Sequence, residues 1–255
     1  MGFITGVYTN IGNYRESNQD SCCVMEADTI KGKVVMVIVC DGMGGLSKGE
    51  VASASVIRAF EEWFEHDFPY DLKENSLSEI KDIWVELIHR ISDKIKTYEA
   101  RENLLMGTTS SGILLVENRC IWVHAGDSRI YYMNADGIRK ITTDHTAAER
   151  EVRRGTLKPE DVQYSKLRSK LTQCVGASKV LIPETGEFTV ESGDVFLLCS
   201  DGFYHKNSEE ELYADFYEMH HDSDQSLNEK CIEKVKTVMA RGEKDNITVG
   251  TVKKE

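Results

Sequence analysis

The sequence has 255 residues, of which 40% are apolar and 29% charged, and its formal net charge is −12. A chain of this length can bury a sizeable core, either as one large domain or as two small ones. The excess of acidic residues argues against nucleic acid or an anionic membrane as the main partner, because both reward clustered Lys and Arg. We therefore expect a globular protein that binds neither nucleic acid nor membrane.

The seven cysteines have the pattern of reduced, buried thiols. Their number is odd, no Cys-x-x-Cys occurs, and several lie inside apolar runs. This usage is typical of a reducing compartment, and no Cys/His cluster has the spacing of a zinc site. The first ten residues lack the basic and apolar regions of a signal peptide, and no apolar run approaches the length of a membrane span. These features predict a cytoplasmic protein.

The first forty residues predict three strands, at 2–10, 21–27 and 33–40. Each segment is short, rich in β-branched residues and bounded by Gly, Asn or Asp. The third strand belongs to the stretch VVMVIVCDGMGG at 34–45, in which an apolar run stops at Asp41 and glycine-rich chain follows. This arrangement would place a carboxylate at the very end of a buried strand.

Two helices follow in the sequence. One apolar stripe with helical spacing runs through 47–64, and a second runs through 80–98. The stripes consist of Val51, Ala54, Ile57, Phe60 and Phe64 in the first helix, and of Ile80, Ile83, Trp84, Leu87, Ile88, Ile91, Ile95 and Tyr98 in the second. Ser76, three residues before Glu79, predicts a capping box at the start of the second helix. We assign both stripes to the hydrophobic core.

Strands return after Met106 and dominate the rest of the chain. We expect them at 107–117, 119–127, 129–134, 137–142, 186–191, 194–200 and 246–254, with helices at 146–154, 208–218 and 224–241. The segment 144–182 is otherwise irregular. Because strands and helices do not alternate regularly, the order favours antiparallel sheets with helices packed outside them. No linker divides the chain, so we expect a single domain over 1–255.

Acidic residues recur at the ends of the predicted strands. Asp41 and Asp201 each end a largely apolar run and precede glycine, Asp127 follows Gly126, and Asp245 precedes the last strand. For any one of them a simple turn is an adequate explanation, since Asp-Gly is a favoured turn dipeptide. The apolar runs before Asp41 and Asp201 indicate central strands, however, whose ends should meet. Carboxylates gathered there would repel one another without cations, and oxygen ligands suit Mg²⁺ or Mn²⁺.

Six motifs extend through almost the whole chain, from about residue 12 to 249. They are GNYRESNQDS, VIVCDGMGG, MGTTSSG, HAGDSRIYYMNADGIRKITTDHT, DVFLLCSDG and EKDNITV. In this order they resemble the motifs of the metal-dependent serine/threonine protein phosphatases, the PPM or type 2C family, in its compact bacterial form. The resemblance implies an α+β fold, a four-layer α-β-β-α sandwich with two central antiparallel sheets flanked by helices.

The resemblance also implies a centre of two Mn²⁺ or Mg²⁺ ions at one end of the sandwich. By motif position, Asp41 would bridge both ions, with the Gly42 carbonyl on one ion and Asp201 and Asp245 on the other. Asp127 would match the aspartate that holds a third, weaker ion with help from Asp201.

Two further residues complete the implied catalytic set. Asp20 would act on a metal directly or through a water, and Arg15 would grip the substrate phosphate. Two cations about 4 Å apart lower the pKa of a water between them, so that hydroxide exists near neutral pH. Arg15 and the metals would stabilise charge on the phosphoryl oxygens. No side-chain nucleophile is needed, so we expect no phospho-enzyme.

Some positions depart from the pattern of the family. Met43 stands where many eukaryotic members have a histidine that protonates the leaving oxygen, so the general acid stays open. His145 matches a family element and is better explained as a hydrogen-bonding residue than as that acid. Gln19 replaces a frequent Glu. Gln173 replaces a frequent Arg in the segment 144–182, which matches the flap linked to substrate choice.

The leading interpretation is an enzyme that hydrolyses phosphoserine and phosphothreonine in phosphorylated proteins. Its expected partners are the substrates of a cognate serine/threonine kinase and the kinase itself, and the chain is expected to be a monomer. One alternative is a pseudo-phosphatase that binds phosphoproteins as a regulator, which should have lost some metal carboxylates. Another is a phosphatase devoted to one regulator, such as an anti-sigma-factor antagonist, but those commonly carry sensor domains for which this chain has no room.

Overall fold

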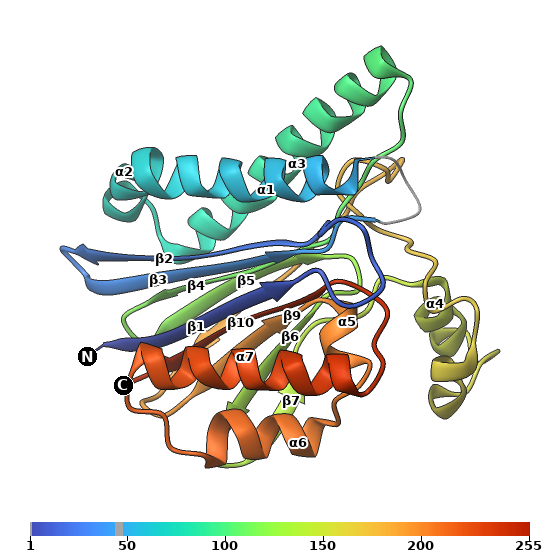
Figure 1. The fold of residues 1–255 in the computed structure, drawn as a ribbon. Coiled ribbons are helices and arrows are strands. Elements are labelled where there is room, and N and C mark those ends of the chain that lie inside the picture. The colour runs from blue at the N-terminus through green and yellow to red at the C-terminus, as the bar shows by residue number, and fades with distance from the viewer. Residues whose placement is uncertain (1, 44–47) are drawn as a thin grey trace.

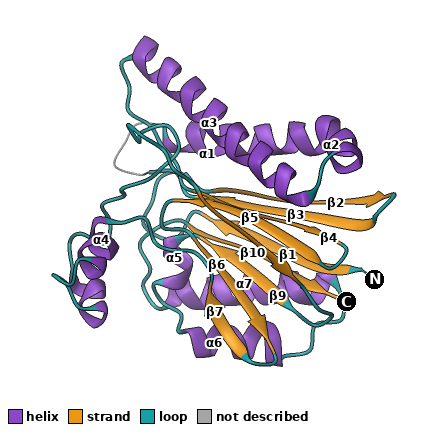
Figure 2. Cartoon of the chain, turned by 180° about the vertical axis from the view of Figure 1, so that it is seen from behind, coloured by secondary structure: helices purple, strands orange, loops and turns teal. Residues whose placement is uncertain are grey.

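The computed structural model describes residues 2–43 and 48–255. Its strands form two antiparallel sheets of five strands each, and helices cover both outer faces (Figure 1). Figure 2 shows the same layers from behind, with the two sheets between the helices. The fold is therefore the α+β, four-layer α-β-β-α sandwich that the sequence predicted.

One sheet has the strand order β1-β10-β9-β6-β7. Its strands are β1 (Phe3–Asn10), β10 (Ile247–Lys254), β9 (Val195–Cys199), β6 (Arg129–Asn134) and β7 (Gly137–Lys140). The helices on its outer side are α5 (Asp201–Tyr204), α6 (Glu209–Tyr213) and α7 (Asp224–Ala240), with a π-helical turn at Ala214–Glu218. The first and last strands of the chain lie side by side, so both termini are at the same end of this sheet (Figure 1).

The other sheet has the strand order β2-β3-β4-β5-β8. Its strands are β2 (Ser21–Thr29), β3 (Gly32–Cys40), β4 (Ser110–Val116), β5 (Arg119–Ala125) and β8 (Glu184–Thr189). The helices on its outer side are α1 (Gly49–Glu62), α2 (Phe68–Glu74) and α3 (Leu77–Glu102), with a π-helical turn at Trp63–Asp67. A capping box starts α3, because Glu79 accepts a hydrogen bond from the Ser76 backbone N–H at 2.7 Å and the Ser76 hydroxyl accepts one from that of Glu79.

The continuous apolar run of β3 is explained by burial on both faces of its sheet. Val35, Val37 and Val39 pack in the core between the two sheets. Met36 and Ile38 point the other way and pack against α1 and α3. A strand buried on both faces needs no alternation of apolar and polar residues. The interior position of β3 also holds its last residues, and whatever follows them, firmly in place.

Ile57, Phe60 and Phe64 of the predicted stripe are buried, but the stripe differs at its start. Ala52, Val56 and Phe60 are buried against the sheet, whereas Val51 is 37% exposed, so its assignment to the core was wrong. Val51 instead borders a groove between α1 and α3. The spacing alone did not decide whether Val51 or Ala52 faces the sheet in the first turn of α1. The predicted helix start at 47, and the glycines at 44 and 45, lie outside the described residues.

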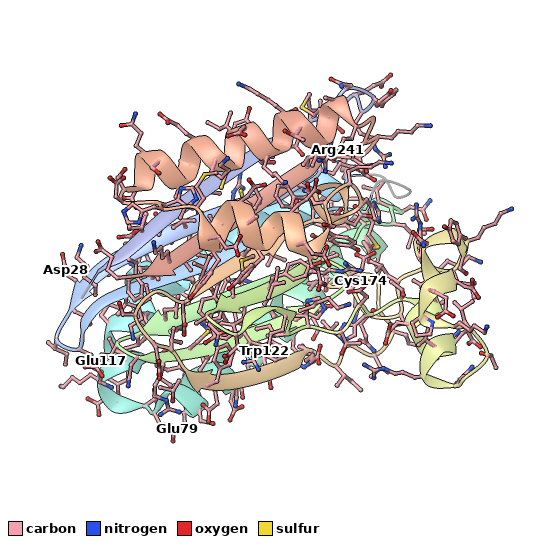
Figure 3. All side chains as sticks on the ribbon, turned by 90° about the horizontal axis from the view of Figure 1, so that it is seen from below. Asp28, Glu79, Glu117, Trp122, Cys174 and Arg241 are labelled. Atoms are coloured by element: carbon pink, nitrogen blue, oxygen red, sulfur yellow. The ribbon has the colours of Figure 1, made fainter. Side chains whose placement is uncertain are left out.

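The segment 144–182 contains α4 (Ala147–Arg153) and a 3₁₀-helix (Pro159–Tyr164). One isolated β-bridge joins Thr146 to Leu171 within the segment, and another joins Val175 to Thr108, just before β4. The start of the segment is attached to the sandwich by the His145 N–H, which donates to the Gly126 carbonyl at 2.7 Å. Figure 3 shows Cys174 of this segment at the opposite end of the sandwich from Glu117, which lies in the β4–β5 turn. That the chain is a single domain stays a prediction. Within the described part of the chain, no helix is both long and apolar enough to cross a membrane.

Candidate active site

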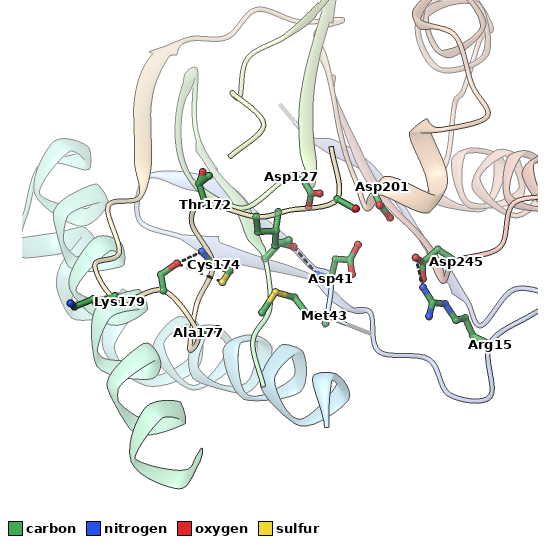
Figure 4. A pocket seen from close by; sticks show the side chains of 15 residues that line it. Arg15, Asp41, Met43, Asp127, Thr172, Cys174, Ala177, Lys179, Asp201 and Asp245 are labelled. Carbon is green, nitrogen blue, oxygen red and sulfur yellow. Dashed lines mark hydrogen bonds and ion pairs between the residues drawn. The ribbon is translucent and has the colours of Figure 1, made fainter. Parts of the chain in front are cut away.

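Four acidic residues lie where central strands end or begin, at one end of the sandwich. Asp41 follows β3 directly, Asp127 lies two residues after β5, Asp201 lies two residues after β9, and Asp245 lies two residues before β10. All four line a pocket of about 720 Å³ (Figure 4). The structure therefore brings together the strand-end acids that the sequence singled out.

The rim of this pocket comes from three other parts of the chain. Arg15 lies in the loop after β1, and Gly42 and Met43 follow Asp41. Opposite them, the segment 144–182 contributes the remaining side, including Lys179 (Figure 4). Lys179 and Arg15 thus lie at opposite sides of the carboxylates.

Asp41 is fixed by three hydrogen bonds to a pair of threonines. Its backbone N–H donates to the Thr109 hydroxyl at 2.8 Å. Its carbonyl oxygen accepts from the Thr109 N–H at 2.8 Å and from the Thr108 hydroxyl at 3.0 Å. The motif MGTTSSG was noted in the sequence, but this role of its threonines was missed because the bonds join residues about 67 positions apart.

Gly42 occupies a place where the backbone of three segments converges. Its N–H donates to the carbonyl oxygen of Gln19 at 3.1 Å. A Cβ atom on Gly42 would collide with the carbonyl oxygens of Gln19 and Gly49. Glycine is therefore required at this position by close approach, which leaves backbone and not a side chain next to Asp41.

Asp20 is buried beside the pocket but does not line it. Its Oδ2 accepts hydrogen bonds from the Ser200 hydroxyl at 2.9 Å and from the Thr248 hydroxyl at 2.7 Å. Burial raises the pKa of Asp20 to about 7, and these two hydrogen bonds oppose the shift. Asp20 thus packs against the residue that precedes Asp201 and against β10.

The carboxyls of the pocket disfavour one another's ionisation. Burial, and then neighbouring carboxylates, raise the pKa of Asp41 and of Asp127 well above its ordinary value. The same causes raise the pKa of Asp201 to about 7. In addition, Asp201 Oδ1 is buried without a hydrogen-bond partner among the described residues. A divalent cation would relieve both the repulsion and the missing partner, and a set of carboxylate oxygens fits Mn²⁺ or Mg²⁺.

Arg15 forms an ion pair with Asp245, in which Arg15 Nη2 lies 2.6 Å from Asp245 Oδ2. The loop that carries Arg15 is held by Asn246, whose side-chain Nδ2 donates to the carbonyl oxygens of Ile11 at 2.9 Å and Ser17 at 3.1 Å. Asn246 was not identified from the sequence, although it directly follows Asp245 in the motif EKDNITV. Its position next to Asp245 in that motif was the one indication in the sequence that Asn246 belongs to the site.

His145 connects the strand end that carries Asp127 to the segment 144–182. Its Nδ1 accepts a hydrogen bond from the Gly126 N–H at 3.2 Å, and its own N–H donates to the Gly126 carbonyl at 2.7 Å. Its carbonyl oxygen accepts from the Thr172 N–H at 2.7 Å. Burial lowers the pKa of His145. These contacts fit the hydrogen-bonding role expected from the sequence.

His124, His145 and Glu184 form a cluster whose potential ligand atoms all lie within 4.8 Å of one another. Both ring nitrogens of His124 are already engaged, at 2.8 Å from the Ser111 hydroxyl and at 3.0 Å from the Thr143 carbonyl. Glu184 accepts a hydrogen bond from the Thr143 N–H. We therefore interpret this cluster as a hydrogen-bonded network and not as a metal site.

A second buried network fixes the start of the segment 144–182. Arg129 donates two hydrogen bonds to the Asp144 carboxylate, at 3.1 and 2.7 Å, and Lys140 adds a third at 2.9 Å. The Arg129 guanidinium also lies 3.6 Å from the centre of the Tyr204 ring. The Tyr204 hydroxyl donates to the Asp127 carbonyl at 3.1 Å. This network joins the base of the segment to the backbone of a pocket carboxylate.

The positions that depart from the family pattern have ordinary local roles. The Gln173 side chain accepts a hydrogen bond from the Ile182 N–H at 2.9 Å and does not line the pocket. The Gln19 side chain donates to Glu50 at 3.2 Å. Met43 lines the pocket, and its N–H donates to the Gly107 carbonyl at 3.0 Å.

Comparison with known proteins identifies the family. The family model of protein phosphatase 2C matches residues 14–239. A protein phosphatase 2C-type sequence from Streptococcus pyogenes is 32% identical to this chain, over 97% of it and 96% of the relative. The chain therefore belongs to the protein phosphatase 2C family of serine/threonine protein phosphatases, which are hydrolases, as its motifs predicted.

Solved structures agree with this assignment. The serine/threonine phosphatase of S. agalactiae superimposes with a TM-score of 0.85, at 29% identity, over 100% of both chains. The catalytic domain of the serine/threonine protein phosphatase PstP, in complex with 2 manganese ions, has a TM-score of 0.78 at 26% identity, over 98% of this chain and 97% of its own. A fold of this kind is thus known with manganese bound.

Proposed function

We propose that this chain hydrolyses phosphoserine and phosphothreonine in phosphorylated proteins, using two Mn²⁺ or Mg²⁺ ions. The observation that carries the proposal is the cluster of strand-end carboxylates, which raise one another's pKa and leave Asp201 Oδ1 without a hydrogen-bond partner among the described residues. Asp41 would bridge both ions, the Gly42 carbonyl would contact one, and Asp201 and Asp245 would hold the other.

Two further carboxylates extend the proposed metal centre. Asp127, with Asp201, would hold a third ion, which is supported by the position of both residues on the same pocket. Asp20 would act on the centre directly or through a water. One of its carboxylate oxygens already accepts hydrogen bonds from Ser200, the neighbour of Asp201, and from Thr248. We therefore expect Asp20 to tune the site more than to bind its ions.

The ions would supply a water of lowered pKa as the nucleophile, together with charge for the phosphoryl oxygens. Arg15 would bind the substrate phosphate, because a guanidinium forms paired hydrogen bonds to two phosphate oxygens. Arg15 is 41% exposed at the pocket rim, so its guanidinium is accessible to a ligand. No cysteine, serine or histidine is proposed as a nucleophile, so no phospho-enzyme is expected.

We propose that the partners are phosphorylated proteins, the substrates of a cognate serine/threonine kinase and the kinase itself, and that the chain is a monomer. All seven cysteines are free thiols, which supports a reducing compartment such as the cytoplasm. The pseudo-phosphatase alternative expects lost carboxylates. Asp41, Asp127, Asp201 and Asp245 are all present.

The proposal is tested by hydrolysis of a phosphothreonine peptide by the purified chain, first in EDTA and then across a Mn²⁺ titration. We expect no turnover in EDTA and turnover that rises with Mn²⁺, without sensitivity to okadaic acid. Absence of turnover at every Mn²⁺ concentration, in a chain shown to be folded by circular dichroism, would overturn the proposal.

A further inference from the structure

A second hollow adjoins the pocket of the carboxylates. It has a volume of about 340 Å³ and shares Ser169, Asp201 and Asp245 with that pocket. Figure 4 shows Asp201 and Asp245 together on the side of the pocket away from Lys179, so the hollow continues the site in that direction. The two hollows thus have a common wall, and we call the second one the side groove.

Three basic residues from three separate segments line the side groove. Arg168 comes from the segment 144–182, Lys206 follows α5, and Lys244 precedes β10. All three are exposed. Arg168 uses one guanidinium nitrogen to donate to the Gln163 carbonyl at 3.0 Å. The amino groups of Lys206 and Lys244 have no hydrogen-bond or ion-pair partner in the described ranges 2–43 and 48–255.

The acidic residues of the side groove do not neutralise these cations. Glu243 has a side chain only 9% exposed, and its Oε1 accepts the backbone N–H groups of Lys244 at 2.7 Å and of Asp245 at 3.1 Å. The Asp245 carboxylate is paired with Arg15. Asp201 faces the pocket, where the proposed ions would bind. Lys206 and Lys244 are therefore charged groups of the side groove that have no partner among the described residues.

We propose that Arg168, Lys206 and Lys244 form a subsite for an Asp or Glu carboxylate of the substrate protein, close in sequence to its phosphorylated residue. An extended chain advances about 7 Å over two residues, so a neighbour of the phosphorylated residue can reach a hollow that shares its wall with the pocket. The inference rests on the proposed function and adds a substrate preference to it: phosphorylated sites flanked by acidic residues.

The test compares phosphothreonine peptides that differ only beside the phosphothreonine. One peptide has two glutamates on its N-terminal side, one has two on its C-terminal side, and one has glutamine at all four positions. We expect kcat/KM for one glutamate peptide to exceed that for the glutamine peptide by about fivefold, from two exposed ion pairs. The ratio should shrink toward one at about 1 M salt, because exposed charges are then screened.

Substitutions in the side groove test whether it causes the preference for glutamate peptides. In Lys206→Ala/Lys244→Ala, the ratio of kcat/KM between the glutamate and glutamine peptides should fall to about one, and Lys244→Glu should bring it below one. The matched control is Lys31→Ala/Lys33→Ala, which removes the same charge at the far end of β3 and should keep the ratio of the parent chain.

The two proposals fail in different ways. If the parent chain hydrolyses all three peptides with the same kcat/KM, the subsite is overturned while the phosphatase proposal stands. A preference that survives unchanged in Lys206→Ala/Lys244→Ala and in Lys244→Glu would also overturn the subsite. If none of the peptides is hydrolysed at any Mn²⁺ concentration, both proposals are overturned.

Discussion

Arg15 and Asp245 form an ion pair at 2.6 Å, although they lie 230 residues apart in the chain. The pair joins the loop after β1 to the residues before β10, which are neighbouring strands of one sheet. It places Arg15, which is proposed to bind the substrate phosphate, directly against Asp245, which is proposed to bind a metal ion. Substrate and metal would therefore be bound by residues that are already in contact.

Removal of the Arg15 guanidinium should weaken substrate binding more than turnover. In Arg15→Ala we expect KM for a phosphopeptide to rise about tenfold or more, because hydrogen bonds to charged groups contribute about 1.5–3 kcal/mol, with a smaller fall in kcat. Arg15→Lys is the matched control, since it keeps the charge but loses the paired geometry. Steady-state kinetics at saturating Mn²⁺ measure both values. A loss confined to kcat would instead place Arg15 in transition-state stabilisation.

Asn246 should matter through the loop that it holds. Asn246→Ala removes two hydrogen bonds to the loop carbonyls of Ile11 and Ser17, and a third to the Gln19 N–H. We expect a destabilisation of about 1–3 kcal/mol and a raised KM, because Arg15 loses its fixed position. Chemical denaturation and phosphopeptide kinetics check the two effects. An Asn246→Ala chain with the KM of the parent would show that the loop is positioned by other contacts.

The metal-free protein should become less stable as pH rises. The folded-state pKa values of Asp41 and Asp127 are raised well above the ordinary value, and that of Asp201 is raised to about 7. A raised pKa means that the stability present below the unfolded-state pKa of about 4 is lost as pH rises through the folded-state value. In EDTA we therefore expect the melting temperature to fall between about pH 5 and pH 8.

Asp41→Asn tests whether repulsion between the carboxylates causes this loss of stability. The substitution removes one of the repelling charges, so in EDTA at about pH 8 the variant should melt about 2–4 °C higher than the parent, which corresponds to about 1 kcal/mol. Saturating Mn²⁺ should reverse the order, because only the parent keeps its full set of ligands. Thermal melts in the two conditions measure both differences. A variant less stable than the parent in EDTA would contradict the repulsion.

The Arg129–Asp144 network should contribute to stability. Asp144→Asn leaves the buried Arg129 guanidinium without its carboxylate, and breaking a buried ion pair in this way costs about 3 kcal/mol. The expected result is a lower denaturation midpoint together with faster proteolysis within 144–182, which Asp144 anchors. Asp161→Asn, the same substitution at an exposed position of the same segment, is the control and should change stability by less than about 0.5 kcal/mol. Equal stability of the two variants would show that Lys140 and Tyr204 suffice to hold Arg129.

Much of the site could be predicted from local sequence. The apolar runs before Asp41 and Asp201 indicated central strands whose ends were expected to meet. The two strands, β3 and β9, belong to different sheets, and the packing of the two sheets brings their ends to one pocket. Asp127 and Asp245 were singled out in the same way, by their places at the end of one predicted strand and just before another. These inferences needed only strand burial and the position of a charge at a strand end.

What could not be predicted depends on contacts between distant segments. Asn246 bonds to loop carbonyls 229 and 235 residues away, and no local pattern specifies such partners. The side groove is formed by residues from three separate segments, each of which is an ordinary exposed cation in the sequence. Val51 was misplaced because helical spacing fixes the period of a stripe but not which of two neighbouring apolar residues at its start, Val51 or Ala52, faces the sheet.

The most direct test of the central claim is calorimetric titration of Mn²⁺ into the metal-free chain and into Asp41→Asn, with phosphopeptide turnover measured on the same samples. If the strand-end carboxylates form the metal centre, the parent binds at least two ions, whereas Asp41→Asn binds fewer and loses at least about 100-fold in turnover. Binding of the same number of ions with near-normal turnover by a folded Asp41→Asn chain would contradict the account.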